Sequence, residues 1–206
     1  LAILTTFFVA PNPVLGLIIG AMVAGAAIGL HRARTVPMTQ MPETVAMMHS
    51  LVGLSAVCIA VAAVLHEGVH HDALHRFELF VGCFVGAITF TASVFAYGKL
   101  AAKKWAKSVS GAWVKPVQAI LFLGMIGFGT VYFISEDLNA FYAMTALALA
   151  FGFIWIAPIG GGDMPVVVSL LNSFSGWAAA GIGFTLNNPM LIIAGSLVGS
   201  SGAILS

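Results

Sequence analysis

Residues 42–65 read PETVAMMHSLVGLSAVCIAVAAVL and are apolar over nearly their whole length. About 20 apolar residues span the hydrocarbon core of a bilayer, and a proline suits the first turn of a helix. The stretch therefore predicts a transmembrane helix. The chain of 206 residues has the same character throughout, because it is 60% hydrophobic and only 7% charged, whereas soluble domains carry about 25% charged residues.

Turns and charge clusters divide the chain into eight apolar segments. They cover about 1–10, 14–30, 42–65, 77–98, 117–134, 140–158, 165–186 and 189–206. Helices of a soluble core have polar outer faces, which these segments largely lack. We predict an all-α membrane protein, a polytopic bundle of about eight transmembrane helices. The apolar sequence starts at the first residue without a signal-peptide pattern, and we expect both ends to be cut from a longer protein.

The basic residues indicate the orientation. Seven of the eight fall in the connections after the second and fourth segments, and Arg76 lies in a connection on the opposite side. The seven are Arg32, Arg34, Lys99, Lys103, Lys104, Lys107 and Lys115. Because cytoplasmic loops carry an excess of Lys and Arg, these two connections and the one before residue 165 are predicted to be cytoplasmic.

An internal repeat relates the two halves of the chain. MPETVAMMHSLVG from Met41 aligns without gaps to MPVVVSLLNSFSG from Met164, with five of thirteen positions identical. GCFVGA from Gly82 similarly matches GSLVGS from Gly195. We predict two four-helix repeats, about 1–98 and 117–206, which an even helix number keeps parallel, as in some transporters.

His49 and Asn172 occupy the same repeat position, seven residues after a proline, so each lies about 10 Å into its helix. Ser169 and Ser173 share a helical face with Asn172. An ionisable group inside a membrane is costly and marks a functional site by default, and an imidazole gains and loses a proton near neutral pH. These four residues are therefore candidates for a proton path. The alternative is that they only hydrogen-bond neighbouring helices.

Two glycine-rich stretches stand out. Gly195, Gly199 and Gly202 would let other helices approach the last segment closely, and packing alone explains that spacing. Asp163 follows three glycines at the start of the 165–186 segment. From the pattern alone we expect it to cap the helix N-terminus.

The stretch from His66 to His70 reads HEGVH and matches the H-E-x-x-H zinc-protease signature, in which two histidines bind zinc and the glutamate is the base. It contains Gly68, which weakens a helix, and it lacks a clear third ligand in register. We therefore expect no functional metal site. Adventitious binding by the histidines of this loop, which are His66, His70, His71 and His75, stays open.

Four motifs in order resemble the membrane domain of proton-translocating nicotinamide nucleotide transhydrogenases. They are MPETVAMMHSLVGL, GAITFTASVFAYGKL, IGGGDMPVVVSLLNSFSGWA and LVGSSGAILS. The resemblance implies that His49 and Asn172 match the channel histidine and asparagine of the family. It also implies that Asp163 lies near the NADP(H)-binding domain, and that the glycines at 195, 199 and 202 belong to the helix leading into it.

The same resemblance implies proton translocation coupled to hydride transfer from NADH to NADP⁺ in attached soluble domains. No dinucleotide-binding fingerprint is present, so we expect this chain to bind no cofactor and to lack the hydride-transfer sites. The implied partners are NAD(H)- and NADP(H)-binding domains, the latter following residue 206, further transmembrane helices and membrane lipids. The complete enzyme would be a homodimer in a bacterial inner membrane, and no nucleic-acid partner is expected.

Two other functions are compatible with parts of the sequence. A secondary transporter with parallel repeats would bind a small solute at the seam between the helices holding His49 and Asn172, but the sequence indicates no helix broken at the midplane. A passive anchoring domain would use its polar seams only for packing, which leaves the histidine at the repeat position without a use.

Overall fold

The computed structural model describes residues 12–66 and 73–206. The chain divides into two units, 1–41 and 42–206, and each is described by itself. The helix predicted over 1–10 lies outside the described residues.

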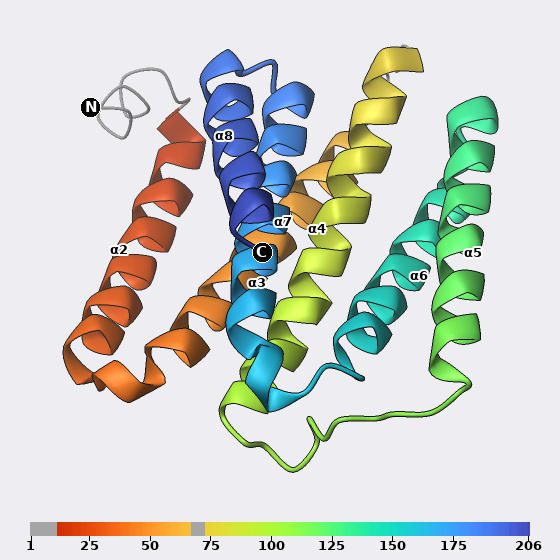
Figure 1. Ribbon diagram of the computed structural model, residues 1–206. Helices are drawn as coiled ribbons and strands as arrows, with labels where there is room; N and C mark the ends of the chain where they lie inside the picture. The colour runs from red at the N-terminus through yellow and green to blue at the C-terminus, as the bar shows by residue number, and fades with distance from the viewer. Residues whose placement is uncertain (1–11, 67–72) are drawn as a thin grey trace. The chain divides into compact units, whose positions relative to one another are not determined.

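Every regular element in the described part of the chain is a helix, which confirms the all-α prediction (Figure 1). The first unit holds α2 (Asn12–Thr35) and the 3₁₀ turn η1 (Met38–Gln40). The remaining elements are α3 (Met41–Leu65), α4 (Ala73–Leu100), α5 (Val114–Ser135), α6 (Leu138–Ile156), the 3₁₀ turn η2 (Gly161–Asp163), α7 (Met164–Thr185) and α8 (Pro189–Leu205). Both α2 and α4 extend beyond their apolar segments, because hydropathy marks the part of a helix inside the bilayer and not its polar ends.

Six of these helices are long and apolar enough to cross a membrane, and α8, at 17 residues, is shorter. The chain is therefore a multi-pass membrane protein. The count of eight spans stays a prediction, because the first segment lies outside the described residues.

Helix α4 is the centre of the unit 42–206. Inside its apolar window 67% of the residues are buried, against 17% for α5. It packs against α6 on one side and α7 on the other, and α5 covers α6 (Figure 1). Buried residues of α3 share clusters with α4 and α7. Another buried cluster joins Ala60 of α3 to residues of α4, α5 and α6.

Glycines bring the helix backbones into contact. A methyl group on Gly181 of α7 would lie 2.8 Å from the Cα of Gly82 in α4. One on Gly53 of α3 would lie 2.7 Å from the carbonyl oxygen of Gly86 in α4. Small residues at such interfaces let helices approach closely, and packing of this kind drives helix association in lipid.

The same contact recurs between α7 and α8. Gly176 of α7 meets the backbone of Gly199 in α8. In the aligned stretches Gly176 corresponds to Gly53, and Gly199 corresponds to Gly86. The pair α7 and α8 therefore packs through the same positions as the pair α3 and α4. The division into two four-helix repeats, which includes residues that the structure does not describe, stays a prediction.

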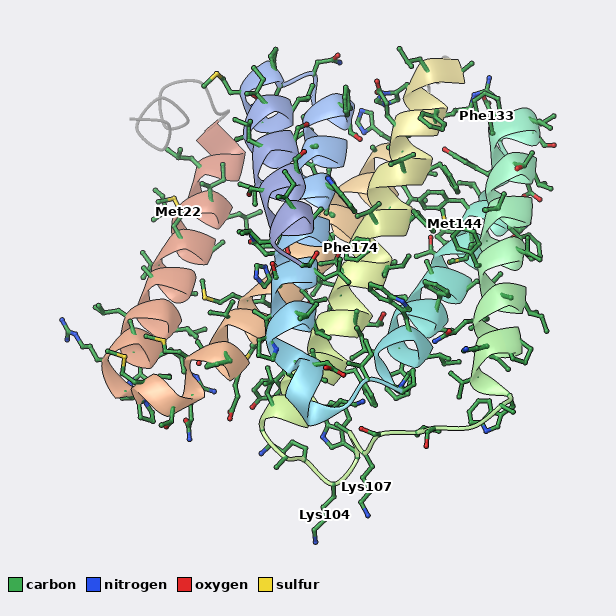
Figure 2. The ribbon with its side chains drawn as sticks, in the orientation of Figure 1. Met22, Lys104, Lys107, Phe133, Met144 and Phe174 are labelled. Carbon is green, nitrogen blue, oxygen red and sulfur yellow. The ribbon has the colours of Figure 1, made fainter. Side chains whose placement is uncertain are left out.

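The two ends of the unit 42–206 carry different charged groups. Lys104 and Lys107 point away from the helices at the α4–α5 connection (Figure 2), which lies at the same end as the α6–α7 connection (Figure 1). At the start of α4, Arg76 Nε lies 3.2 Å from Glu136 Oε1, and Arg76 Nη1 donates to the carbonyl oxygen of Phe133 at 2.8 Å. The cytoplasmic assignment of the lysine end stays a prediction.

The glycine contacts can be tested at Gly195. A methyl group there would lie 2.5 Å from the amide nitrogen of Ala180 and 2.6 Å from the carbonyl oxygen of Gly176, so Gly195→Ala must push α8 away from α7. We expect a loss of about 1–3 kcal/mol, as for other overpacked sites, seen as a lower midpoint of thermal unfolding in detergent. Gly127→Ala is the matched control, because a methyl group at Gly127 of α5 meets nothing within 4 Å. Equal midpoints for the two variants would contradict the packing described.

Candidate functional site: a histidine between two membrane helices

His49 lies on α3, half-buried, and its ring contacts α7. Its Nδ1 atom is 2.7 Å from the hydroxyl oxygen of Ser175. The same hydroxyl lies 2.8 Å from the carbonyl oxygen of Leu171, one turn earlier in α7, and donates to it. The imidazole is therefore held by a polar contact between two helices inside the membrane-spanning part of the bundle.

These two contacts favour one tautomer of the histidine. A hydroxyl carries one proton, which Ser175 can donate to the carbonyl of Leu171. The Ser175 oxygen then accepts from the ring, so Nδ1 of His49 carries the hydrogen. In the neutral ring Nε2 is left as the acceptor, and it is the nitrogen at which a further proton is taken up or released.

The two predicted channel serines lie on the other side of α7. Ser169 Oγ donates to the carbonyl oxygen of Gly202 in α8 at 3.1 Å, and Ser173 Oγ donates to the carbonyl oxygen of Ser169 at 3.3 Å. Ser173 is fully buried. The structure thus brings these serines together with the last-helix glycines, whereas the contact of His49 is made by Ser175.

Asn172 is half-buried one helical turn before Ser175. Within the described residues its side-chain amide has no hydrogen-bond partner in the protein. Residues three apart on a helix are neighbours on its surface, so the amide lies close to the hydroxyl that holds His49. An amide with two donors and an acceptor oxygen can orient water there.

Sequence reasoning missed two polar residues. Ser175 follows Asn172 by three positions, so the same helical spacing could have found it. Ser93 of α4 is fully buried, and its hydroxyl has no hydrogen-bond partner among the described residues. No spacing rule singles out Ser93, because its sequence neighbours are apolar or make hydrogen bonds within their own helix.

Asp163 precedes α7 and is exposed. The capping role expected from the pattern is wrong, because its side chain accepts no cap hydrogen bond. A capping residue has extended backbone angles, whereas the 3₁₀ turn gives Asp163 φ −92° and ψ 3°. The carboxylate is left facing outward without a partner among the described residues.

Most of the H-E-x-x-H stretch falls on residues 67–72, which the structure does not describe. His66 is exposed at the end of α3, and His75 Nδ1 lies 3.3 Å from Glu78 Oε2. Within 12–66 and 73–206, no three His, Cys, Asp or Glu side chains are grouped so that they could hold a metal ion.

The fold and this site define a multi-pass membrane protein with a histidine held between two of its helices. The sequence model of the NAD(P) transhydrogenase beta subunit matches residues 1–206. Two curated sequences from Rhodospirillum rubrum, both named NAD(P) transhydrogenase subunit beta, are each 47% identical over 213 residues. The chain therefore belongs to the NAD(P) transhydrogenase beta-subunit family.

These matches cover 100% of this chain and 46% of each relative, so the chain spans less than half the length of these relatives. It is the membrane component of a transhydrogenase beta subunit. A relative from a bacterium fits a location in a bacterial inner membrane.

The tautomer of His49 can be tested by ¹⁵N NMR of histidine-labelled protein, with the His49 signals assigned by their loss in His49→Gln. We expect the neutral ring to carry its hydrogen on Nδ1, and Ser175→Ala to shift the population toward the Nε2–H form, because the acceptor is lost. Ser201→Ala, which removes a hydroxyl that bonds only within α8, should leave the spectrum unchanged. A wild-type ring protonated at Nε2 would contradict the hydrogen-bond assignment.

Proposed function

We propose that this chain is the proton-conducting part of a proton-translocating transhydrogenase, in which proton movement is coupled to hydride transfer between NADH and NADP⁺ in attached soluble domains. The observation that carries the proposal is the contact between His49 and Ser175. It holds an ionisable ring between two membrane helices with one nitrogen engaged and the other able to exchange a proton.

In this proposal the imidazole is the protonatable element of the path. The Ser175 hydroxyl fixes the ring plane, so that Nε2 keeps one direction while it gains and loses a proton. Asn172 is a positioning residue, because an amide cannot carry a proton but can orient water or the ring. Ser169 and Ser173 act at the α7–α8 contact in the same path.

Coupling to the soluble domains is assigned to the ends of α7 and α8. The outward carboxylate of Asp163 is suited to a charge-assisted hydrogen bond with a partner domain. Gly195, Gly199 and Gly202 keep α8 against α7, so that a displacement of one helix is passed to the other. This close packing supports a mechanical connection between the NADP(H) side and α7, whose Ser175 contacts His49.

The cofactors belong to the complete enzyme. NAD(H) and NADP(H) would bind the soluble partner domains, and this chain would supply neither hydride-transfer site. Membrane lipids, further transmembrane helices and a second copy of the complete enzyme are its other proposed partners.

No observation favours the rival transporter. Both α3 and α7 run without a break past His49 and Asn172, whereas solute sites of transporters are typically formed by discontinuous helices. Passive anchoring explains neither the histidine at the helix contact nor the outward carboxylate.

His49→Ala in the complete enzyme tests the proposal. We expect it to suppress proton pumping, and the steady-state turnover tied to pumping, by about 10²-fold, the lower range for loss of a proton-transfer group. Hydride exchange between nucleotides that stay bound should survive, because that chemistry belongs to the soluble domains. Asn172→Ala should give a milder defect. Dye-reported proton uptake in vesicles, measured beside both hydride assays, provides the comparison.

His66→Ala is the matched control, since His66 is an exposed histidine just beyond α3, and it should leave pumping unchanged. Full pumping by a folded His49→Ala enzyme would reduce His49 to a packing residue.

A pair of aspartates separates coupling from capping. Asp163→Ala should weaken the dependence of pumping on NADP(H) by about tenfold, the effect of losing one hydrogen bond to a charged group, with the unfolding midpoint unchanged. Asp137→Ala should do the reverse, because Asp137 Oδ1 accepts from the amide of Asn139 at 2.9 Å and caps α6. Its loss should cost about 1 kcal/mol and leave pumping intact. If Asp163→Ala lowers only the midpoint, the aspartate has no coupling role.

A further inference from the structure

The side-chain ammonium of Lys99, in the last turn of α4, is surrounded by oxygen atoms. It donates to the carbonyl oxygens of Ile156 at 2.9 Å, Ala157 at 2.6 Å and Ile159 at 2.6 Å. The hydroxyl oxygen of Ser108 lies 3.2 Å away. Lys99 is half-buried, so this lysine differs from the exposed basic residues that follow it on the same connection.

The ammonium group of Lys99 and the carbonyl oxygens around it are chemically complementary. An ammonium group has three donors and no acceptor, and the last carbonyls of a helix lack partners and carry the negative end of its dipole. Here they are the final carbonyls of α6 and of the turn that follows. The ring of Phe95 lies 5.3 Å from the same nitrogen, within the range of a cation–π contact.

A second set of contacts ties the α4–α5 connection to the same carbonyls. The hydroxyl of Ser108 donates to the carbonyl oxygen of Ile159 at 3.3 Å. The amide of Val109 donates to the carbonyl oxygen of Ala157 at 3.1 Å. The end of α4, the connection after it and the end of α6 are thus held together around one charge.

These contacts reach Ile159, and the segment that follows is open. Residues 160–162 are glycines, and a methyl group on any of them would meet nothing within 4 Å. The exposed Asp163 and the start of α7 come next. The chain therefore passes from a segment held by five hydrogen bonds directly into three residues without close packing.

We propose that Lys99 is a positioning residue for coupling: its ammonium fixes the point from which the glycine segment at 160–162 and Asp163 move. This rests on the proposed function, because it assigns Asp163 to the NADP(H)-domain face. With the end of α6 held to α4, a displacement of Asp163 is passed into α7 and toward Ser175. Without the ammonium, the α6–α7 connection absorbs the displacement and His49 is not affected.

Lys99→Ala in the complete enzyme tests the proposal in membrane vesicles. We expect a loss of coupling, with fewer protons moved per hydride than in the wild-type enzyme, while hydride exchange between bound nucleotides is retained. Lys103→Ala, an exposed lysine four residues later, is the matched control and should keep the wild-type ratio.

Lys99→Arg keeps the charge and guards against a simple folding defect. A planar guanidinium cannot direct three donors from one atom to three carbonyls, so we expect a reduced proton-to-hydride ratio here as well.

The outcomes separate this proposal from the function on which it rests. A wild-type proton-to-hydride ratio in Lys99→Ala or Lys99→Arg, with His49→Ala inactive in pumping, would overturn the role of Lys99 and leave the proton path standing. A lower unfolding midpoint with an unchanged ratio would also overturn it, since Lys99 would then only clamp the helix end. If His49→Ala pumps protons at the full wild-type rate, the proposed function itself fails.

Discussion

The backbone contact of α7 with its neighbours is the constraint on which the rest of the structure depends. Gly181 lies against Gly82 of α4, and Gly176 lies against Gly199 of α8. In lipid, helices are not driven together by the hydrophobic effect but by close packing and interhelical hydrogen bonds. Because the backbones already touch, side chains on the flanks of α7 are fixed to within a small range, and the Ser175 hydroxyl can hold the His49 ring at 2.7 Å.

The same packing explains how a site at the end of the bundle can reach one inside it. Helix α7 begins directly after Asp163 and holds Ser175 about three turns later. It has little freedom to bend between α4 and α8. A rigid helix of this kind passes a displacement along its length. The proposed coupling therefore requires only α7 itself, and no series of contacts through other helices. In the proposed coupling, that displacement starts at the glycines at 160–162, beside the point that Lys99 holds.

Apolar segments and charge runs predicted the helices well, because length and hydropathy are local properties of the chain. The site was predicted only in part. On a helical wheel Ser175 lies near Asn172, whereas Ser173 lies nearly opposite Ser175. Only the packing of three helices decides which neighbour each serine meets, so that Ser173 lies toward α8 and Ser175 meets His49. The sequence predicts that Asp163 caps α7. Asp163 is instead the last residue of the 3₁₀ turn η2, and its backbone angles do not suit capping. From the sequence alone, Lys99 cannot be distinguished from the other lysines of the same connection, because its carbonyl partners lie 57 to 60 residues away.

In the proposed function, His49 takes up and releases a proton in step with the nucleotide state of the attached domains. The most direct measurement is the ¹⁵N spectrum of His49 in the complete enzyme in lipid, recorded at one pH with NADP⁺ bound and again with NADPH bound. We expect the fraction of doubly protonated imidazole to differ between the two states, and Lys99→Ala to remove the difference. The same fraction in both states of the wild-type enzyme would contradict it.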